Sequence, residues 1–168
     1  MGGYYQDITA SYLNTGGVYD IAGDTWSDVS TSNAPDRRLG HTAVWTGTQM
    51  IVWGGTYYDT SYNYLTTGGV YDIASDTWRP TSTNSTPDGC NGHTAVCTGT
   101  QMIVWGGNDY NGARNYYNTG GVYNIANDSW TPISINNAPA PRSFHTAVCT
   151  GTQMIVWGDI IKILLPLI

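Results

Sequence analysis

One stretch of this sequence is written three times at a constant spacing. "HTAVWTGTQMIVWGG" begins at His41, returns as "HTAVCTGTQMIVWGG" at His93, and returns again as "HTAVCTGTQMIVWGD" at His145, 52 residues apart each time. A second block, "NTGGVYD" at Asn14, recurs at the same interval, and a tryptophan follows each copy. A repeat of this length is one supersecondary unit that cannot bury its faces alone, so neighbouring units must stack.

Each repeat predicts four antiparallel strands. In the first complete repeat the apolar or β-branched runs cover residues 41–46, 50–53, 70–73 and 77–81. The links "TGTQ" and "IASD" are short enough for hairpins. In "MIVW" both alternating sets of side chains are apolar, so the second strand must be covered on both faces. We therefore expect four-stranded sheets that stack face to face.

Composition agrees with an all-β chain and excludes some functions. All 12 acidic residues are aspartate, and Lys162 is the single lysine, so residues that favour exposed helices are scarce. The net charge is -6 and six basic residues are scattered, which argues against nucleic acid as a partner. Three cysteines without a CxxC pair signal neither a disulfide framework nor a zinc site. We expect Cys97 and Cys149 to be small buried groups, and Cys90 lies in a variable loop where exposure is expected.

Three features at fixed offsets resemble the kelch motif: "WGG" after the second strand, "VYD" in the third and the tryptophan of the fourth. The resemblance covers residues 1–159 and extends to bacterial kelch-like repeats and galactose-oxidase-type propellers. It implies an all-β fold, a partial β-propeller whose four-stranded antiparallel blades repeat every 52 residues. Kelch repeats usually carry an arginine before the first strand. Arg38 and Arg142 fit that position, but the middle repeat has Cys90 there.

The repeat predicts an incomplete propeller. We expect a half blade with the third and fourth strands over residues 1–33, full blades over 34–85 and 86–137, and a half blade with the first two strands over 138–158. Residues 159–168, "DIIKILLPLI", match no repeat. Loss of one G from codons for Gly-Gly-Tyr-Tyr yields Gly-Asp-Ile-Ile, so the tail is interpreted as a frameshift product. A short apolar strand or patch is the alternative. The chain then reads as a fragment of a larger kelch-like protein, with open blade edges that invite self-association.

The links between second and third strands vary most among the repeats. Residues 4–15, 56–67 and 108–119 are rich in Tyr, Asn, Asp and Thr, a mixture that suits protein or glycan contacts. The candidate ligand-binding residues are Tyr57, Tyr58, Asp59, Tyr62, Tyr110, Arg114, Tyr116 and Tyr117. The alternative for each tyrosine is that it packs down on the blade.

Other repeated polar residues favour structural roles. Three histidines at one repeat position suggest a repeated hydrogen bond more than a metal site, so no metal and no cofactor are expected. Asp24, Asp76 and Asp128 are expected to close the turn between third and fourth strands by Asx bonding, with calcium binding alongside Asp20 and Asp72 as the alternative. No histidine lies outside the repeat, so the copper radical oxidases of the galactose-oxidase class are not supported.

These patterns predict a non-catalytic recognition module that binds protein or glycan through the variable links. The alternative is a fragment of a carbohydrate-active propeller enzyme whose catalytic residues lie outside this chain. A third interpretation is an assembly unit in which two copies pair their half blades into a six-bladed ring. No signal peptide follows Met1 and no membrane span is expected, but the bacterial repeats it resembles place the full-length protein outside the cell or on its surface.

Overall fold

The computed structural model describes residues 3–5 and 11–158, and within them the chain forms strands and turns without a helix. Two four-stranded antiparallel sheets form its centre, in the orders β5-β6-β9-β10 and β11-β12-β15-β16. The first comprises β5 (Thr42–Trp45), β6 (Gln49–Trp53), β9 (Gly68–Asp72) and β10 (Thr77–Pro80); the second comprises β11 (Thr94–Cys97), β12 (Gln101–Trp105), β15 (Gly120–Asn124) and β16 (Ser129–Pro132). The prediction of an all-β chain of four-stranded propeller blades is confirmed.

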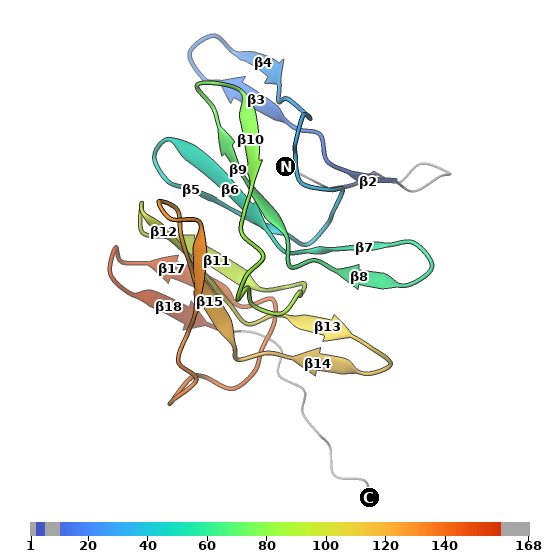
Figure 1. The fold of residues 1–168 in the computed structure, drawn as a ribbon, viewed down its shortest axis with the longest axis vertical. Coiled ribbons are helices and arrows are strands. Elements are labelled where there is room, and N and C mark those ends of the chain that lie inside the picture. The colour runs from blue at the N-terminus through green and yellow to red at the C-terminus, as the bar shows by residue number, and fades with distance from the viewer. Residues whose placement is uncertain (1–2, 6–10, 159–168) are drawn as a thin grey trace, which may run out of the picture.

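A two-stranded sheet lies beyond each central sheet. β3 (Gly17–Asp20) pairs with β4 (Thr25–Asp28), and β17 (Thr146–Cys149) pairs with β18 (Met154–Trp157). Figure 1 shows the four sheets in chain order from blue to red, and the first strands β5, β11 and β17 are neighbours in space. The apolar tail for which we infer a frameshift, residues 159–168, lies outside the described residues.

Strand register repeats as closely as the sequence does. Val52 lies opposite Gly69 in one blade, and Val104 lies opposite Gly121 in the next. Side chains on both faces of β6 are buried, with Ile51 and Val52 exposed by 0% and 2%. This confirms that the second strand is covered on both sides, because sheets on either side supply the cover.

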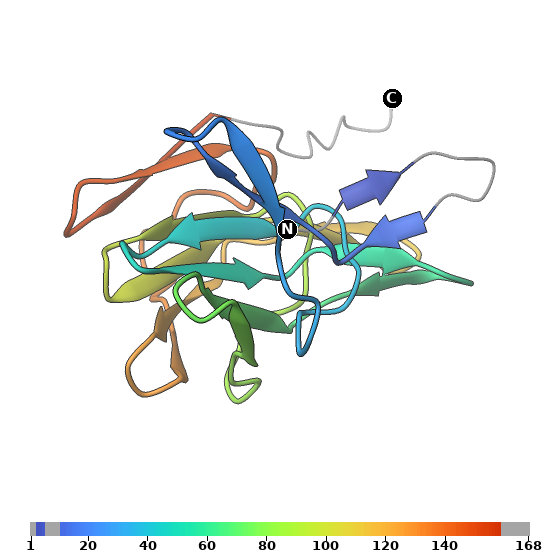
Figure 2. The same cartoon turned by 90° about the horizontal axis from the view of Figure 1, so that it is seen from above.

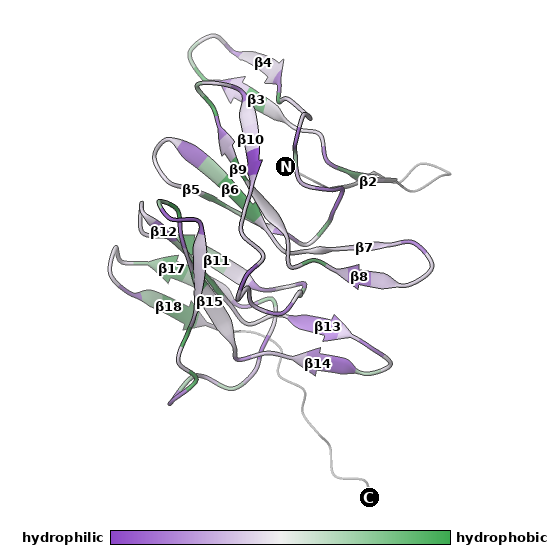
Figure 3. Cartoon of the chain, in the orientation of Figure 1, coloured by the Kyte–Doolittle hydropathy of each residue, from purple (hydrophilic) through white to green (hydrophobic). Residues whose placement is uncertain are grey.

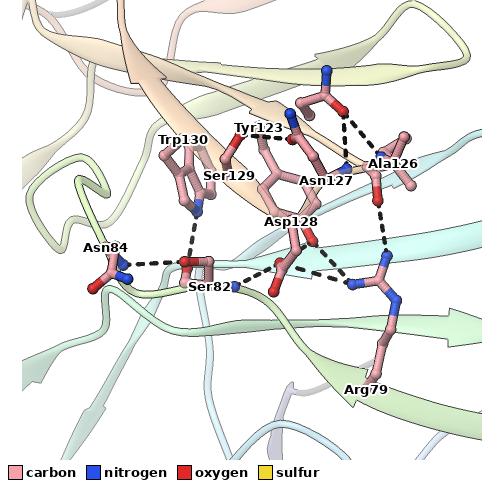
Figure 4. A network of polar contacts seen from close by, with 11 residues as sticks. Arg79, Ser82, Asn84, Tyr123, Ala126, Asn127, Asp128, Ser129 and Trp130 are labelled. Atoms are coloured by element: carbon pink, nitrogen blue, oxygen red, sulfur yellow. Dashed lines mark hydrogen bonds and ion pairs between the residues drawn. The ribbon is translucent and has the colours of Figure 1, made fainter.

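A recurring set of hydrogen bonds, which we call the interblade clasp, joins each of the two four-stranded blades to the blade before it. The indole Nε1 of Trp130 donates to the backbone oxygen of Ser82 at 3.0 Å, and the amide of Ser82 donates to Oδ1 of Asp128 at 2.8 Å (Figure 4). Trp78 and Asp76 hold Ser30 in the same way, at 2.9 Å each. Trp78 and Trp130 therefore join adjacent blades.

The turn aspartates do not act as the sequence suggested. Asp72 accepts hydrogen bonds from the backbone amides of Ala74 and Ser75 at 3.1 and 3.0 Å. It stands four positions before Asp76, the residue expected to close this turn. Asp76 instead has a φ of 51° and reaches the neighbouring blade through the clasp. The Asx-turn prediction for Asp24, Asp76 and Asp128 is therefore wrong, because the carboxylate that can reach those amides stands at the start of the turn.

The repeated histidines also join adjacent blades. Nε2 of His93 lies 2.9 Å from Oγ1 of Thr42, and His145 lies 2.7 Å from Thr94 in the same way. This confirms the repeated hydrogen bond. The glycine pair after β6 begins with Gly54. Its φ is 70°, and a Cβ added there would lie 2.7 Å from the His93 ring, so this position requires glycine.

One buried position accepts either arginine or cysteine. Arg38 is 1% exposed and donates to the backbone oxygens of Gly54 and Thr67 at 2.9 and 2.8 Å. Cys90 takes this place in the next blade, where its thiol donates to the oxygen of Gly106 at 3.4 Å. Exposure of Cys90 was the wrong expectation, because it is 2% exposed and fills the arginine position.

The other two cysteines differ from expectation in the opposite direction. Cys97 and Cys149 are half-buried rather than buried. They end the first strands of their sheets, where Trp45 in the first repeat is 52% exposed. Within the described residues, no helix has the length and apolar character required to cross a bilayer.

Candidate functional site

The variable links fold as two-stranded ribbons rather than irregular loops. They are β1 (Gly3–Tyr5) with β2 (Ser11–Leu13), β7 (Thr56–Tyr58) with β8 (Tyr62–Tyr64), and β13 (Asn108–Tyr110) with β14 (Arg114–Tyr116). Figure 1 and Figure 2 both show the ribbons on one side of the blades, opposite the tight turns that link first and second strands. β13 and β14 are largely hydrophilic, in contrast to the apolar stretches of β17 and β18 (Figure 3).

The second and third ribbons are each fixed at the base to the segment that precedes the blade's first strand. Thr56 and Leu39 exchange backbone hydrogen bonds of 2.8 Å, and Asn108 and Asn91 do the same at 2.8 and 2.9 Å. The ribbons are therefore held by the scaffold from which they project. A sequence signal for the third ribbon was present, since Asn-Gly at 111–112 is typical of hairpin turns; in the structure three residues, 111–113, link the two strands and Gly112 has a φ of 76°.

Aspartates shape two of these ribbons from within. Asp59 accepts hydrogen bonds from the amide of Ser61 and from Nδ2 of Asn63, both at 3.1 Å. These amides, with that of Thr60, hold the pKa of the Asp59 carboxyl below its usual value. Asp59, predicted as a contact residue, thus has a structural task at the ribbon tip.

Two clefts separate neighbouring ribbons. The first cleft, of about 450 Å³, is lined by Tyr12, Asn14, Asp36, Arg37, Tyr57 and Asp59. Within it the guanidinium carbon of Arg37 lies 5.7 Å from the ring centre of Tyr57. That ring meets Tyr12 edge-on at 6.5 Å. The first cleft therefore combines aromatic faces with charges of both signs.

The second cleft, of about 320 Å³, lies between β7–β8 and β13–β14. It is lined by Tyr62, Tyr64, Asn91, Asn108, Tyr110, Arg114 and Phe144. Asn108 is 6% exposed, and its side-chain oxygen has no hydrogen-bond partner among the described residues. Among the described residues the ion pair found is the one between Arg79 and Asp128. Within that part of the chain, Arg114 therefore forms no ion pair with a carboxylate. The second cleft thus offers an unused donor at Arg114, whereas the Asn108 oxygen is buried beneath the cleft surface.

Phe144 stands in an unfavourable backbone conformation at the edge of the second cleft. Its φ is 59°, and it occupies the repeat position held by Gly40 and Gly92, whose φ values are 63° and 68°. A bulky residue in this region is an outlier that costs about 1–3 kcal/mol. Its side chain is 59% exposed. Such strain is typical of binding sites, because selection for stability alone would have kept glycine.

The structure divides the eight predicted residues among several places. Tyr62, Tyr110 and Arg114 line the second cleft, and Tyr57 and Asp59 line the first. Tyr58 meets Tyr62 edge-on at 5.1 Å between ring centres, and Tyr116 is half-buried in β14. Tyr117 packs against the core and donates its hydroxyl to Asp109 at 2.8 Å, so the packed alternative holds for it.

Sequence reasoning missed the cleft residues outside the variable links. Arg37, Asn91 and Phe144 come from the segments that precede the first strands, which the fold brings beneath the ribbons. Phe144 had a signal, because "LGH" and "NGH" become "SFH" in the third copy. In the described part of the chain no group of three or more His, Cys, Asp or Glu side chains is placed to hold a metal ion.

Stacked four-stranded antiparallel sheets, joined by the same clasp at two successive steps, define a β-propeller repeat protein. The model of the KLHDC2/KLHL20/DRC7 Kelch-repeats domain matches residues 40–160 of this sequence. The chain therefore belongs to the kelch-repeat family.

Several kelch relatives match most of this chain. Human Kelch domain-containing protein 3 is 30% identical over 128 residues, which cover 74% of this chain and 32% of that protein. Tip elongation aberrant protein 1 of Schizosaccharomyces pombe is 29% identical over 77% of this chain and 12% of its own length. Human Host cell factor 2 is 29% identical over 80% of this chain and 17% of its own length. The chain thus spans about a third or less of these relatives.

Proposed function

We propose that this chain is a protein-recognition module whose second cleft takes an extended polypeptide segment. Membership of the kelch-repeat family supports a protein-interaction role. The second cleft supplies the detail, since it lies between two ribbons that the scaffold holds at their bases.

The Arg114 guanidinium, which lines the second cleft and pairs with no carboxylate among the described residues, is the observation on which the proposal depends. It can donate to a carbonyl or carboxylate of a bound segment. The rings of Tyr62, Tyr110 and Phe144 offer rigid apolar faces, which suit side chains of a peptide.

A glycan is the alternative ligand. The first cleft favours it, because Tyr12 and Tyr57 stand beside the polar groups of Asn14, Asp36 and Asp59. The enzyme alternative depends on residues outside this chain. Placement of the full-length protein outside the cell also stays a prediction.

Selection from a displayed random-peptide library tests the proposal directly. Peptides retained by the immobilised chain are measured by titration calorimetry against the unmodified protein, Arg114→Ala and Arg37→Ala. The two arginines are matched, because each lines one cleft. We expect Arg114→Ala to weaken binding about tenfold or more, as loss of a charged hydrogen bond predicts, and Arg37→Ala to leave it unchanged.

A glycan panel is probed with the same preparation. Glycan binding abolished by Arg37→Ala, with no peptide retained, would replace the proposal by the glycan alternative. Peptide binding that is equally weak in both arginine variants would remove the second cleft as the site.

A further inference from the structure

We propose that Asn111, at the tip of the third ribbon, is a site of spontaneous deamidation. The backbone nitrogen of Gly112 attacks the side-chain carbonyl carbon of Asn111 and passes its proton to the side-chain nitrogen, which leaves as ammonia. Water then opens the cyclic imide at either of its two carbonyl carbons. One opening leaves aspartate and the other leaves isoaspartate. Each gives the chain one further negative charge, and water is the only co-reactant.

The chain contains two asparagine–glycine pairs, at residues 91–92 and 111–112. Glycine after asparagine favours the reaction, because it has no Cβ to obstruct the approach of its nitrogen and its backbone turns easily. By sequence alone the two pairs are equally reactive. The structure distinguishes them, since one pair is held by its neighbours and the other is not.

The asparagine–glycine pair at the ribbon tip is unrestrained. Asn111 and Gly112 are both exposed, and a Cβ added to Gly112 would meet nothing within 4 Å. Within the described ranges, no hydrogen bond engages the Asn111 side chain or the Gly112 N–H. Exposed loop tips of this kind open locally at little cost in free energy. The attacking nitrogen and the carbon that it attacks are therefore free to approach each other.

The other asparagine–glycine pair is held on both sides. Asn91 exchanges backbone hydrogen bonds with Asn108 at 2.8 and 2.9 Å, and Gly92 accepts one from the Phe144 amide at 2.7 Å. The Asn91 side-chain oxygen packs against Gly40. Ring closure must turn the rigid peptide plane between Asn91 and Gly92, which these contacts oppose. This pair should therefore react only after local opening.

The matching tip of the second ribbon already carries a carboxylate. Asp59 holds the repeat position of Asn111, 52 residues earlier. Asp59 accepts hydrogen bonds from the Ser61 amide and from Nδ2 of Asn63, both at 3.1 Å. The third ribbon has a backbone amide and an asparagine at the same two positions. Its tip can therefore hold the aspartate product without unfolding.

The isoaspartate product is expected to disturb the third ribbon. It routes the main chain through the former side chain and so adds one carbon to the link between β13 and β14. That link comprises residues 111–113, and Tyr110 lies opposite Arg114 where it begins. Because the length of a link fixes how two paired strands meet, the extra carbon should loosen the pairing at the tip.

Either product places a negative charge near Arg114. This residue lies opposite Tyr110, which precedes Asn111, and it forms no ion pair with a carboxylate among the described residues. A carboxylate at position 111 can attract the guanidinium and compete with an acidic group of a ligand. Deamidation should therefore weaken peptide binding in the second cleft. This consequence rests on the proposed function, whereas the reaction itself does not.

Mass spectrometry of the ageing protein tests the proposal. The folded chain is incubated in water enriched in heavy oxygen and digested, and tandem mass spectra separate position 111 from position 91. We expect position 111 to convert at least about tenfold faster than position 91, because Asn91 must first lose its backbone bonds to Asn108. Both aspartate and isoaspartate should form with heavy oxygen incorporated. Alkaline pH should speed the conversion, since removal of the Gly112 proton promotes the attack.

The same chain unfolded in urea is the matched control. Both asparagine–glycine pairs then lose their contacts, so we expect positions 91 and 111 to convert at similar rates. Asn111→Gln is the second control, and it is expected to abolish the fast conversion because the longer glutamine side chain closes its ring slowly. Near-ultraviolet circular dichroism confirms that the starting protein and the variant are folded.

Equal conversion at both positions of the folded chain overturns the proposal. Conversion of position 111 in urea alone also overturns it, since the fold would then protect the tip. Aspartate as the sole product does the same, because direct hydrolysis forms no imide.

Peptide binding provides a separate arm. A peptide selected for the second cleft should bind the deamidated fraction, separated by ion exchange, about tenfold more weakly than the fresh chain. Aged and fresh Asn111→Gln should bind it equally. Unchanged affinity after conversion would contradict the effect on Arg114. Failure to retain any peptide would contradict the proposed function alone, because conversion is measured without a ligand.

Discussion

Single residues at which one repeat departs from its siblings carry most of the functional information. Phe144 replaces a glycine and lines a cleft, and Cys90 replaces an arginine and keeps its hydrogen bond to the same backbone oxygen position. The first departure adds strain and a ring, which suits a binding role. The second preserves the scaffold. Burial raises the pKa of the Cys90 thiol to about 12, which keeps it protonated and unreactive.

Replacement of Phe144 by glycine is predicted to stabilise the fold and weaken ligand binding. Glycine adopts the positive φ without strain, so the free energy of unfolding should rise by about 1 kcal/mol after the greater flexibility of unfolded glycine is subtracted. Urea unfolding measures this gain, and calorimetry with a selected peptide measures the loss. Ile135→Gly is the control, since Ile135 is similarly exposed and its φ is not positive. Equal destabilisation by both changes would show that Phe144 is not strained.

Buried histidine predicts how stability depends on pH. His93 is 5% exposed, and burial lowers its pKa to about 4 from an ordinary value of 6.5. Between those values the unfolded chain binds more protons, so stability is complete above pH 6.5 and falls as the pH drops towards 4, by about 3 kcal/mol for this group. His41, with a pKa also lowered to about 4, adds to the slope.

Urea unfolding at pH 7 and pH 4.5 measures that slope in the unmodified chain and in His93→Gln. We expect the glutamine variant to lose roughly half of the pH dependence. Asp72 and Asp76, whose pKa values are lowered by hydrogen bonds, lose their contribution only below about pH 3.8. An unchanged slope in His93→Gln would show that His93 titrates freely.

At the scale of strands and turns, the interblade clasp couples neighbouring sheets. Asp128 accepts hydrogen bonds from Ser82 and Tyr123 and lies 3.8 Å from the guanidinium of Arg79 (Figure 4). Arg79 also donates to the Tyr123 hydroxyl at 3.1 Å. One turn residue thus holds parts of two blades.

Replacement of Asp128 by glycine is predicted to cost about 1–3 kcal/mol of unfolding free energy. Glycine keeps the positive φ of 50° while removing the acceptor, so the Ser82 amide and the Tyr123 hydroxyl each lose a hydrogen bond worth about 0.5–1.5 kcal/mol. Asn127→Gly in the same turn is the matched control, because Asn127 bonds only within the turn, to Ser129 at 2.6 Å. Chemical denaturation compares the two, and equal losses would show that the clasp adds no stability.

The sequence predicted strands well where the repeat constrained them and failed where it did not. Alternation and short links located the four strands of each blade, because burial on both faces dictates apolar residues there. The ribbons were missed, since their polar, tyrosine-rich alternation lacks a buried face. The turn aspartates were misassigned because their partner, Ser30 or Ser82, lies in another blade. Likewise, the cleft residues Arg37 and Phe144 join the ribbons only through the fold.

For the whole molecule, stacking decides which side chains are buried. Equivalent tryptophans range from 0% exposed at Trp53 to 79% at Trp157, although their local sequence is the same. The difference depends only on whether a complete neighbouring blade is present. Burial is thus a property of the array, as expected for repeat proteins whose stability is a sum of unit and interface terms.

Indole N–H exchange, resolved for the seven tryptophans by nuclear magnetic resonance, tests this stacking most directly. Four indoles donate to backbone oxygens: Trp53 to Thr66, Trp78 to Ser30, Trp105 to Asn118 and Trp130 to Ser82. The account predicts that these four exchange with solvent far more slowly than indoles of an unstructured chain. It also predicts a contact between the Trp78 indole and Ser30, 48 residues away. Exchange of Trp78 and Trp130 at unstructured rates in a folded chain would contradict the stacked-blade account.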